Sequence, residues 1–346
     1  MDYEIVVGVC TKNCENTIES IVKKVDKALT KYFPKNNSLI ICCDGSSKDA
    51  TKKNFNSIKT KSDKKWIVEK GKKSKGSAVK TIIQKVKPLG FKTVLILDGD
   101  LENLKELWIK RMINPVLNKG YDASISSYKT HKYDTLIGKT LIYPLIKALF
   151  NIDLKTPMTG EYCLSRKLCL DLLGSKYFPN DHSIDLFTTL TIMCEGYKTC
   201  EIKLGTRNHC SSCEYCNPEK VLIPRFTQIL KEFISLARYY KSSINKNKKH
   251  KIDKKCSYDK GRIKNIEICV PAYKEFSRDY IQNDLEYVME IYKHINKQSM
   301  TGLKIAWLNW LCIYFEKTSK MSNDDVEKLL KDLTKLFADN KELLKL

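Results

Sequence analysis

Short apolar runs that end in polar residues recur through the first part of the chain. Residues 4–9, 38–43 and 93–97 are such runs, and the last of them ends abruptly at Asp98-Gly99-Asp100. Apolar residues at helical spacing follow the first run through residues 18–29. Continuously apolar strands that alternate with helices are typical of parallel sheets covered on both faces. The pattern therefore predicts an α/β fold, with a mainly parallel sheet flanked by helices.

Weaker patterns extend this outline to the rest of the chain. Further strands are expected at residues 66–68, 123–126 and 199–204, and helices at 78–86, 137–150, 165–173 and 183–195. The last third is helical in pattern, with helices expected at 224–240, 273–294, 303–315 and 323–344. We predict a catalytic domain at 1–240, a basic linker at 241–264 and a C-terminal helical domain at 265–346.

Charge and cysteine content restrict where the protein acts and what it binds. The 62 Lys and Arg residues exceed the 40 Asp and Glu residues by a net charge of +22, which favours anionic partners such as phosphorylated small molecules, nucleic acid or an anionic membrane surface. The beginning of the sequence lacks the pattern of a secretory signal, and no apolar stretch reaches the roughly 18 to 20 residues that span a bilayer. The sequence therefore predicts a cytoplasmic protein whose 14 cysteines are reduced.

Three of those cysteines form a C-x-x-C-x-x-C run at Cys210, Cys213 and Cys216. This spacing suits zinc or an iron–sulfur cluster, although both usually need a fourth ligand. A bound metal, a cluster and a cysteine-rich loop all remain open interpretations.

The Asp98-Gly99-Asp100 triplet is the first candidate site. Two carboxylates one residue apart at a strand end can both approach a hard cation, which takes oxygen ligands. Such a cation can bridge the two phosphates of a nucleotide diphosphate and stabilise it as a leaving group. Because Asp-Gly also marks ordinary turns, the triplet alone does not decide the function.

Five segments in a fixed order give the triplet its context. They are Val6 to Glu15 (VVGVCTKNCE), Asp44 to Thr51 (DGSSKDAT), Lys73 to Ala78 (KSKGSA), Asp98 to Leu101 (DGDL), and Thr159 to Tyr162 (TGEY) together with SIDLF at 183–187 and LGTRNH at 204–209. The order and spacing resemble the GT-A fold glycosyltransferases, and within them retaining enzymes related to glucosyl-3-phosphoglycerate synthase and mannosylglycerate synthase. The resemblance covers about residues 4–240.

This resemblance implies a reaction and a set of site residues. It implies metal-dependent transfer of a hexose from UDP-glucose or GDP-mannose to a small anionic acceptor such as 3-phosphoglycerate or glycerate. It places Mg²⁺ or Mn²⁺ on Asp98, Asp100 and His209, and Asp185 and Glu161 near the reacting centre. The donor-binding residues it implies are Thr11, Lys12, Glu15, Asp44, Lys75, Gly76 and Asp98.

Structural roles compete with these assignments. Asp44 precedes a glycine, as turn-forming aspartates do, and Lys75 stands in a run of surface lysines. Glu161 could cap the helix expected at 165–173, and Asp185 could satisfy the first turn of the helix expected at 183–195.

The sequence also departs from the family pattern. Cys14 stands where an acidic residue is common, and Gly138-Lys139-Thr140 only approximates the acceptor-binding segment. Lys139, Arg166 and Arg207 are further candidates for binding an anionic acceptor, or are solvated surface charges.

Other functions remain open as alternatives. A polyprenyl-phosphate glycosyltransferase would use the positive charge and the amphipathic segment 224–240 at a membrane surface. A sugar nucleotidyltransferase would have a Gly-rich loop after its first strand, which this chain lacks. A non-enzymatic nucleic-acid-binding protein is suggested by charge alone, and no recognisable nucleic-acid-binding motif supports it. The C-terminal helices are a plausible surface for a homo-oligomer.

Overall fold

The computed structural model describes residues 2–210, 218–243, 252–255, 258–275 and 281–346. They group into two compact units, which we call the sheet unit and the helical unit. The sheet unit comprises Met1–Lys129, Met158–Cys210 and Lys251–Arg262, and the helical unit comprises Thr130–Pro157, Ser211–His250 and Ile263–Leu346. The borders of these units do not coincide with the predicted domain boundaries at residues 240 and 264. Those boundaries stay a prediction about the functional division of the chain.

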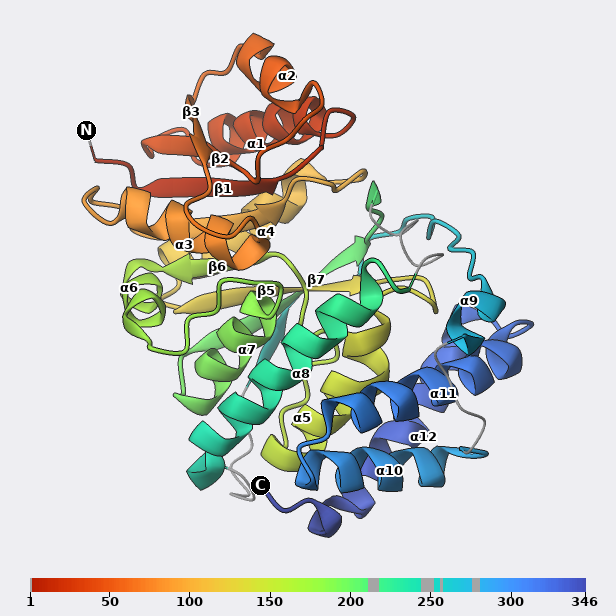
Figure 1. Cartoon of the computed structure of the whole chain (residues 1–346). Helices are drawn as coiled ribbons and strands as arrows, with labels where there is room; N and C mark the ends of the chain where they lie inside the picture. Colours follow the sequence, from red (N-terminus) through yellow and green to blue (C-terminus); the bar gives the residue numbers. More distant parts are fainter. Residues whose placement is uncertain (1, 211–217, 244–251, 256–257, 276–280) are drawn as a thin grey trace. The chain divides into compact units, whose positions relative to one another are not determined.

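The described residues of the sheet unit form a sheet of eight strands in the order β3-β2-β1-β4-β6-β5-β7-β8 (Figure 1). Strand β6 runs antiparallel to both of its neighbours, β4 and β5, and the other pairings are parallel. The strands are β1 Ile5–Thr11, β2 Ser38–Asp44, β3 Asp63–Val68, β4 Thr93–Asp98, β5 Ala123–Lys129, β6 Tyr162–Ser165, β7 Thr199–Thr206 and β8 Asp253–Lys255. The predicted mainly parallel sheet is confirmed.

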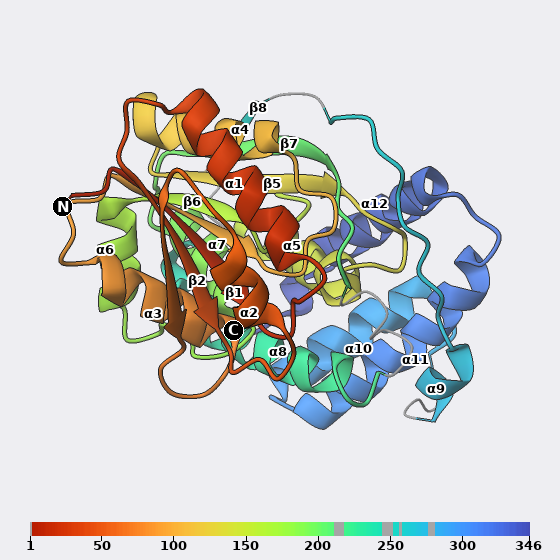
Figure 2. The ribbon, with the colours of Figure 1, turned by 90° about the horizontal axis from the view of Figure 1, so that it is seen from above.

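Helices cover both faces of this sheet (Figure 2). On one face, the buried apolar residues of α1 and α4 form a single core with alternate residues of β1, such as Val7. On the other face, α3 packs on β1 and β2 and against α6. There, Gly8 lies so close to Ile82 of α3 that an added Cβ would stand 2.8 Å from its Cδ1. The period-two alternation of β1 thus places its apolar side chains in two separate cores.

The sheet unit contains elements that the sequence did not reveal. Helices α2 (Thr51–Ser57) and α4 (Glu106–Asn118) and strands β6 and β8 were not predicted, whereas α1 (Ile18–Tyr32), α3 (Lys75–Val86), α6 (Arg166–Gly174) and α7 (Ile184–Cys194) confirm expected helices. Strand β8 lies inside the stretch predicted as a basic linker. It pairs with the edge of β7, with Glu201 opposite Lys254.

The helical unit has an aromatic core. Phe226 of α8 (Leu222–Tyr239) stacks on Trp307 of α11 (Met300–Thr318) with ring centroids 4.7 Å apart. Trp307 also donates a hydrogen bond from Nε1 to Thr140 Oγ1 at 2.9 Å. Residue Thr140 lies in a π-helical turn, Gly138–Ile142, which continues into α5 (Tyr143–Phe150) and confirms the helix expected at 137–150. Aromatic stacking of this kind adds to the stabilisation from burial alone.

One predicted helix of this unit is wrong in its extent. Residues 273–294 were expected to form one helix, but α9 is Val270–Lys274 and α10 is Asp284–Asn296. Asn283 begins α10, because its side chain accepts a hydrogen bond from the backbone N–H of Glu286 and so caps the helix. The last helix, α12, is Asn323–Asp339, a few residues shorter than expected.

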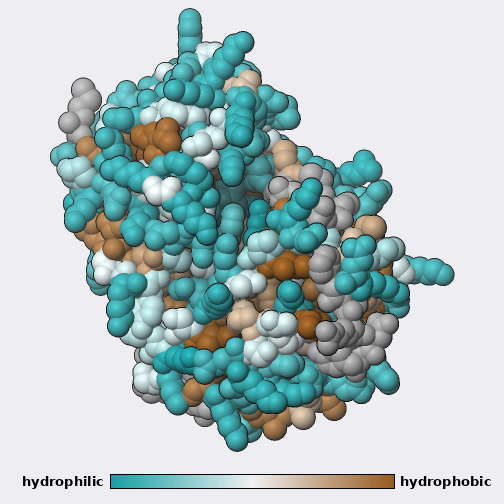
Figure 3. Space-filling view, in the orientation of Figure 1, coloured by the Kyte–Doolittle hydropathy of each residue, from teal (hydrophilic) through white to brown (hydrophobic). Residues whose placement is uncertain are grey.

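Hydrophilic residues dominate the face of the molecule seen in Figure 3. No helix within the described residues is both long enough and apolar enough to cross a membrane.

Candidate functional site

The candidate site begins where the parallel strands end. In the sheet register Thr11 of β1 lies opposite Asp44 of β2, and Cys10 lies opposite Asp98 of β4. The carboxyl ends of β1, β2 and β4 therefore lie along one edge of the sheet, which is where α/β folds bind their ligands. The Asp98-Gly99-Asp100 triplet is placed at that edge.

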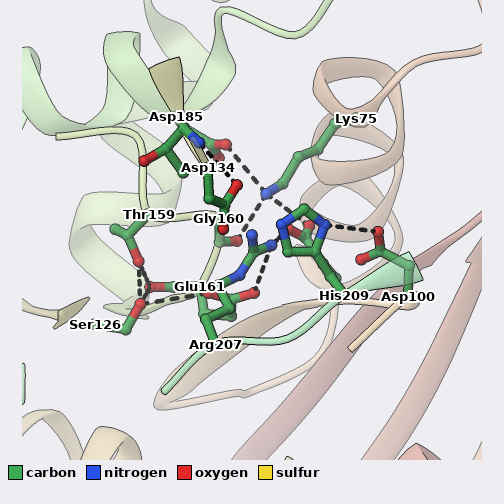
Figure 4. A network of polar contacts seen from close by, with 12 residues as sticks. Lys75, Asp100, Ser126, Asp134, Thr159, Gly160, Glu161, Asp185, Arg207 and His209 are labelled. Atoms are coloured by element: carbon green, nitrogen blue, oxygen red, sulfur yellow. Dashed lines mark hydrogen bonds and ion pairs between the residues drawn. The ribbon is translucent and has the colours of Figure 1, made fainter. Parts of the chain in front are cut away.

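Lys75 lies at the centre of the polar network in Figure 4. Its ammonium group is 2.7 Å from Asp98 Oδ1 and 3.1 Å from Asp185 Oδ2, and it donates a hydrogen bond to the Gly160 carbonyl oxygen at 2.8 Å. The side chains of Lys75, Asp98 and Asp185 are only 12%, 19% and 13% exposed. Lys75 is therefore an enclosed cation with two carboxylate partners, and the interpretation as one more surface lysine is wrong.

Arg207, which follows β7, forms the second cationic centre. Its Nη2 is 2.8 Å from Asp98 Oδ2 and 3.4 Å from Glu161 Oε1. Asp98 is thus held between Lys75 on one oxygen and Arg207 on the other. Glu161 is fully buried, and its backbone carbonyl accepts hydrogen bonds from the N–H and the hydroxyl of Ser126.

Gly160 allows these charged groups to come together. Its φ is +88°, a conformation that side chains strongly disfavour. An added Cβ would stand 2.5 Å from Asp98 Oδ2 and 3.2 Å from Lys75 Nζ. The position preceding Glu161 therefore requires glycine for both space and backbone conformation.

Burial and neighbouring charges shift the pKa values of the charged groups in this network. Burial raises the pKa of Glu161 to about 7, although the Arg207 charge opposes the shift. Burial also raises the pKa of Asp185, against the opposing charge of Lys75. Burial by itself would lower the pKa of Lys75, but Asp185 and Asp98 raise it well above its usual value. Asp185 Oδ1 is buried and has no hydrogen-bond partner among the described residues. The network thus has an acceptor atom available to a ligand.

The raised pKa of Glu161 gives a prediction about stability. In the unfolded chain a glutamate has a pKa of about 4.3, whereas folded Glu161 has a pKa of about 7. The folded state therefore binds more protons between these values, and the stabilisation present below about pH 4 is lost as the pH rises through about 7. We expect Glu161→Gln to remove this pH dependence, a change of up to about 3 kcal/mol relative to wild type between pH 4 and 8.

Urea unfolding of the metal-free protein across this pH range checks the prediction. Glu19→Gln is the matched control, because the Glu19 side chain is 55% exposed and faces solvent. The control should keep the wild-type slope of unfolding free energy against pH. Parallel slopes for wild type and Glu161→Gln would contradict the assignment of the pH dependence to Glu161.

Asp100 and His209 form a separate pair beside this network. Asp100 Oδ2 lies 3.6 Å from His209 Nδ1, and His209 is 4% exposed. Asp98, the third predicted metal ligand, does not join them, since both of its oxygens contact cations. Within the described part of the chain, no three His, Cys, Asp or Glu side chains are grouped closely enough to hold a metal ion.

The donor set nevertheless fits a divalent cation that also binds a ligand phosphate. A carboxylate oxygen and an imidazole nitrogen are both ligands that Mn²⁺ accepts, and Mg²⁺ sites commonly combine one or two carboxylates with substrate phosphates. Three carboxylates, those of Asp98, Glu161 and Asp185, contact the cations Lys75 and Arg207, and the carboxylate of Asp100 lies beside them with His209. When all four are ionised, the excess of negative charge equals the charge of one divalent cation.

The loop before α3 fixes the position of Lys75. Ser74 caps the helix by accepting a hydrogen bond from Ser77 N–H, and its hydroxyl donates to the Asn180 carbonyl at 2.8 Å. Gly76 N–H donates to the Asp181 carbonyl at 3.1 Å. The start of α3 is thereby attached to the segment that leads into α7, the helix that carries Asp185. This attachment explains how two residues far apart in the sequence form an ion pair.

The predicted donor-binding residues at the ends of β1 and β2 differ in exposure and in their hydrogen bonds. Lys12 is exposed at the end of β1. Thr11 is buried and donates a hydrogen bond to the Cys43 carbonyl, and both oxygens of Asp44 accept hydrogen bonds from Ser47. Glu15 accepts from the Ala50 N–H at 2.9 Å. Thr11, Asp44 and Glu15 thus shape the turns after β1 and β2, and their contacts with a donor stay a prediction.

Some residues have roles that sequence patterns did not reveal. Glu69 accepts a hydrogen bond from Ser74 N–H at 2.8 Å and so supports the loop that carries Lys75. The guanidinium of Arg166 donates hydrogen bonds to the carbonyls of Leu89 and Lys87, and so it has a structural role within the sheet unit. Arg207 was only one of three basic candidates, and its position two residues before His209 was the available signal. Cys213 and Cys216 lie outside the described residues.

Comparisons with known proteins agree with this architecture. Residues 6–163 match the family model described as glycosyl transferase family 2. A search of curated proteins finds no match. Among solved structures, the chain is similar to glucosyl-3-phosphoglycerate synthase from Mycobacterium tuberculosis in complex with Mn²⁺, UDP-glucose and phosphoglyceric acid, with a TM-score of 0.56, 19% identity, and coverage of 68% of this chain and 80% of that chain.

Two further complexes of the same enzyme give similar values. The complex with Mg²⁺ and UDP has a TM-score of 0.54 and 20% identity, and covers 68% of this chain and 79% of that chain. The complex with Mn²⁺, UDP-glucose and glycerol 3-phosphate has a TM-score of 0.53 and 20% identity, and the match covers 68% of this chain and 80% of that chain. At this level of identity the likeness establishes the fold. Residues 6–163 thus match glycosyl transferase family 2, and the chain is a glycosyltransferase with the GT-A fold.

Proposed function

We propose that this glycosyltransferase moves a hexose from UDP-glucose or GDP-mannose to a small anionic acceptor of the glycerate type, with retention of the anomeric configuration. The arrangement of Lys75 and Arg207 on either side of Asp98 carries the proposal. A nucleotide diphosphate brings negative charge and phosphate oxygens, and two neighbouring cationic side chains can bind such a group. The solved complexes with UDP-glucose and with phosphoglyceric acid or glycerol 3-phosphate support this choice of substrates.

Asp100 and His209 would hold Mg²⁺ or Mn²⁺, with Asp98 close by. The metal, when bound, supplies positive charge to the diphosphate as it leaves the sugar. Lys75 and Arg207 then act from fixed positions on the other phosphate oxygens. Because their carboxylate partners already orient them, little reorganisation is needed when charge develops on the leaving group.

Asp185 and Glu161 would act on the sugar and the acceptor. Asp185 Oδ1 is a buried acceptor atom without a described partner, so it can accept a hydrogen bond from a hydroxyl of either substrate. In the transfer, the acceptor hydroxyl oxygen bonds to the anomeric carbon as that carbon's bond to the diphosphate breaks. The departing diphosphate takes the hydroxyl proton. Protein catalysis is then mainly positioning and charge stabilisation.

The cellular setting follows from these substrates. Nucleotide sugars and phosphorylated acceptors are cytoplasmic metabolites, and we propose that the enzyme acts there. The eleven cysteines in the described residues carry free thiols, as a reducing compartment requires.

Release of nucleoside diphosphate tests the proposal. Purified protein would be incubated with UDP-glucose or GDP-mannose, Mg²⁺ or Mn²⁺, and one of three acceptors: 3-phosphoglycerate, D-glycerate or a short polyprenyl phosphate. We expect release that requires both metal and a glycerate-type acceptor, and NMR of the product should show an α-glycoside. Release with the polyprenyl phosphate alone would instead support a lipid-directed enzyme. Salt-sensitive binding of nucleic acid without turnover of any donor would contradict the proposal.

A further inference from the structure

A short antiparallel contact joins the two residues of the Asp100–His209 pair. Leu101 forms an isolated β-bridge with His209. The N–H of Glu102 donates to the Asn208 carbonyl at 3.0 Å, and the N–H of Cys210 donates to the Asp100 carbonyl at 3.1 Å. The chain after β4 therefore runs beside the chain after β7. This contact brings Asp100 and His209 together although 109 positions separate them in the sequence.

The side chain of Asn103 extends this contact beyond the last backbone hydrogen bond. Its Nδ2 donates to the Thr206 carbonyl at 2.7 Å, and its Oδ1 accepts from the Asn208 N–H at 3.1 Å. The two partners are the carbonyl of one residue and the N–H of the residue two positions later. A neighbouring β-strand would form the same two hydrogen bonds with its backbone, so the side-chain amide of Asn103 takes the place of a backbone peptide group. Asn103 thus attaches the segment that leads to His209 at two points.

Each of the joined segments is also attached to the sheet on its own side. Gly99 N–H donates to the Cys10 carbonyl at 2.8 Å, and the Thr17 hydroxyl donates to the Gly99 carbonyl at 2.6 Å. On the other side, Arg207 N–H donates to the Lys129 carbonyl at 3.0 Å. The turn that carries Asp100 and the segment that carries His209 are therefore held by different strands. Asn103 adds a side-chain connection between them, made to the backbone on both sides of Arg207.

We propose that Asn103 is a positioning residue for a divalent cation bound by Asp100 and His209, a proposal that rests on the metal-dependent function proposed above. Two ligands from different segments bind a cation well only when their separation is fixed in advance. Residues that orient the ligands typically contribute a factor of about 10 to 100 in metal affinity. Asn103 acts through the backbone around His209 and does not touch the metal or the substrates.

The helical unit contains a closely matched control. Asn296 donates from Nδ2 to the Leu343 carbonyl at 2.7 Å and accepts at Oδ1 from the Lys345 N–H at 2.7 Å. It therefore makes the same two-bond connection, to a carbonyl and to the N–H two residues later. Asn103 and Asn296 are both partly exposed. Replacing Asn296 removes an equivalent pair of hydrogen bonds from a part of the chain that contributes nothing to the Asp100–His209 pair.

Titration with Mn²⁺ alone, followed by the electron paramagnetic resonance signal of free Mn²⁺, tests the proposal on the full-length protein. We expect Asn103→Leu to weaken Mn²⁺ binding on the order of tenfold, and Asn296→Leu to leave it unchanged. Asn103→Ala, a smaller change, provides the same test if the leucine variant does not fold. Repeating the titration with UDP present should preserve the difference between the two positions.

The possible failures are distinguishable. Wild-type affinity in folded Asn103→Leu and Asn103→Ala, or equal weakening in Asn296→Leu, would overturn the positioning role and leave the proposed function intact. Absence of Mn²⁺ binding by wild-type protein, with and without UDP, would overturn the metal-dependent function and this inference with it.

Discussion

Replacing Lys75 with methionine is expected to reduce transferase activity by on the order of 100-fold or more and to destabilise the protein by about 3 kcal/mol. Lys75 contacts Asp98 and Asp185 at 2.7 and 3.1 Å in a largely enclosed site. Without the ammonium group, both carboxylates keep their desolvation cost, while Asp185 loses its ion-pair partner and Asp98 keeps only Arg207. The diphosphate of a bound donor also loses one of its two expected contacts with cationic side chains.

Lys80→Met is the control for this prediction. Lys80 lies in the same helix, α3, is partly exposed, and contacts Asn180 Oδ1 at 3.5 Å. Its replacement should change stability by less than about 0.5 kcal/mol and leave turnover unaffected. Urea unfolding and initial-rate kinetics measure both effects. If Lys75→Met retained wild-type kcat, the proposed contact between Lys75 and the leaving group would be wrong.

Gly76→Ala should destabilise the protein by about 1 to 3 kcal/mol and lower activity as well. An added Cβ would stand 2.5 Å from the Pro179 carbonyl oxygen and 2.7 Å from the backbone N and O of Asp181. These are backbone atoms, which cannot move aside as the end of a flexible side chain can. The start of α3 would have to shift away from the segment before α7, and that shift would separate Lys75 from Asp185.

Gly174→Ala provides the matched comparison. Gly174 is the last residue of α6, and nothing lies within 4 Å of the position of an added Cβ. Alanine has a higher helix propensity than glycine, so this variant should be as stable as wild type or more stable, by up to about 1 kcal/mol. Thermal unfolding of the two variants side by side checks the prediction. Equal melting temperatures would show that the segment before α7 yields easily to a side chain at position 76.

The parts of the fold that the sequence predicted are those with strong local patterns. Strands β1, β2 and β4 are continuous apolar runs, and α1 has apolar residues at helical spacing. Strand β8 has the sequence Asp-Lys-Lys and was predicted as linker. Its extended conformation comes from pairing with the edge of β7, and no pattern within three polar residues indicates such a partner.

The candidate site was predictable only in part, for a related reason. The Asp98-Gly99-Asp100 triplet is visible because both carboxylates follow one strand. The ion pair between Lys75 and Asp185 joins residues 110 positions apart, and it depends on how α3 and α7 are attached to each other. Resemblance to a known family suggested that both residues belong to the site. Their direct contact, the second cationic contact from Arg207 and the connection made by Asn103 became apparent only in three dimensions.

The most direct test of the account is the metal dependence of UDP release from UDP-glucose with 3-phosphoglycerate as the acceptor, in wild type and Asp100→Asn. We predict release by wild-type protein with Mn²⁺, none after chelation with EDTA, and recovery when Mn²⁺ is restored. Asn at position 100 keeps the size of the side chain and removes its charge, so release should fall by on the order of 100-fold or more. Release that is unaffected by EDTA and unchanged in Asp100→Asn would contradict the claim that this site performs metal-dependent glycosyl transfer.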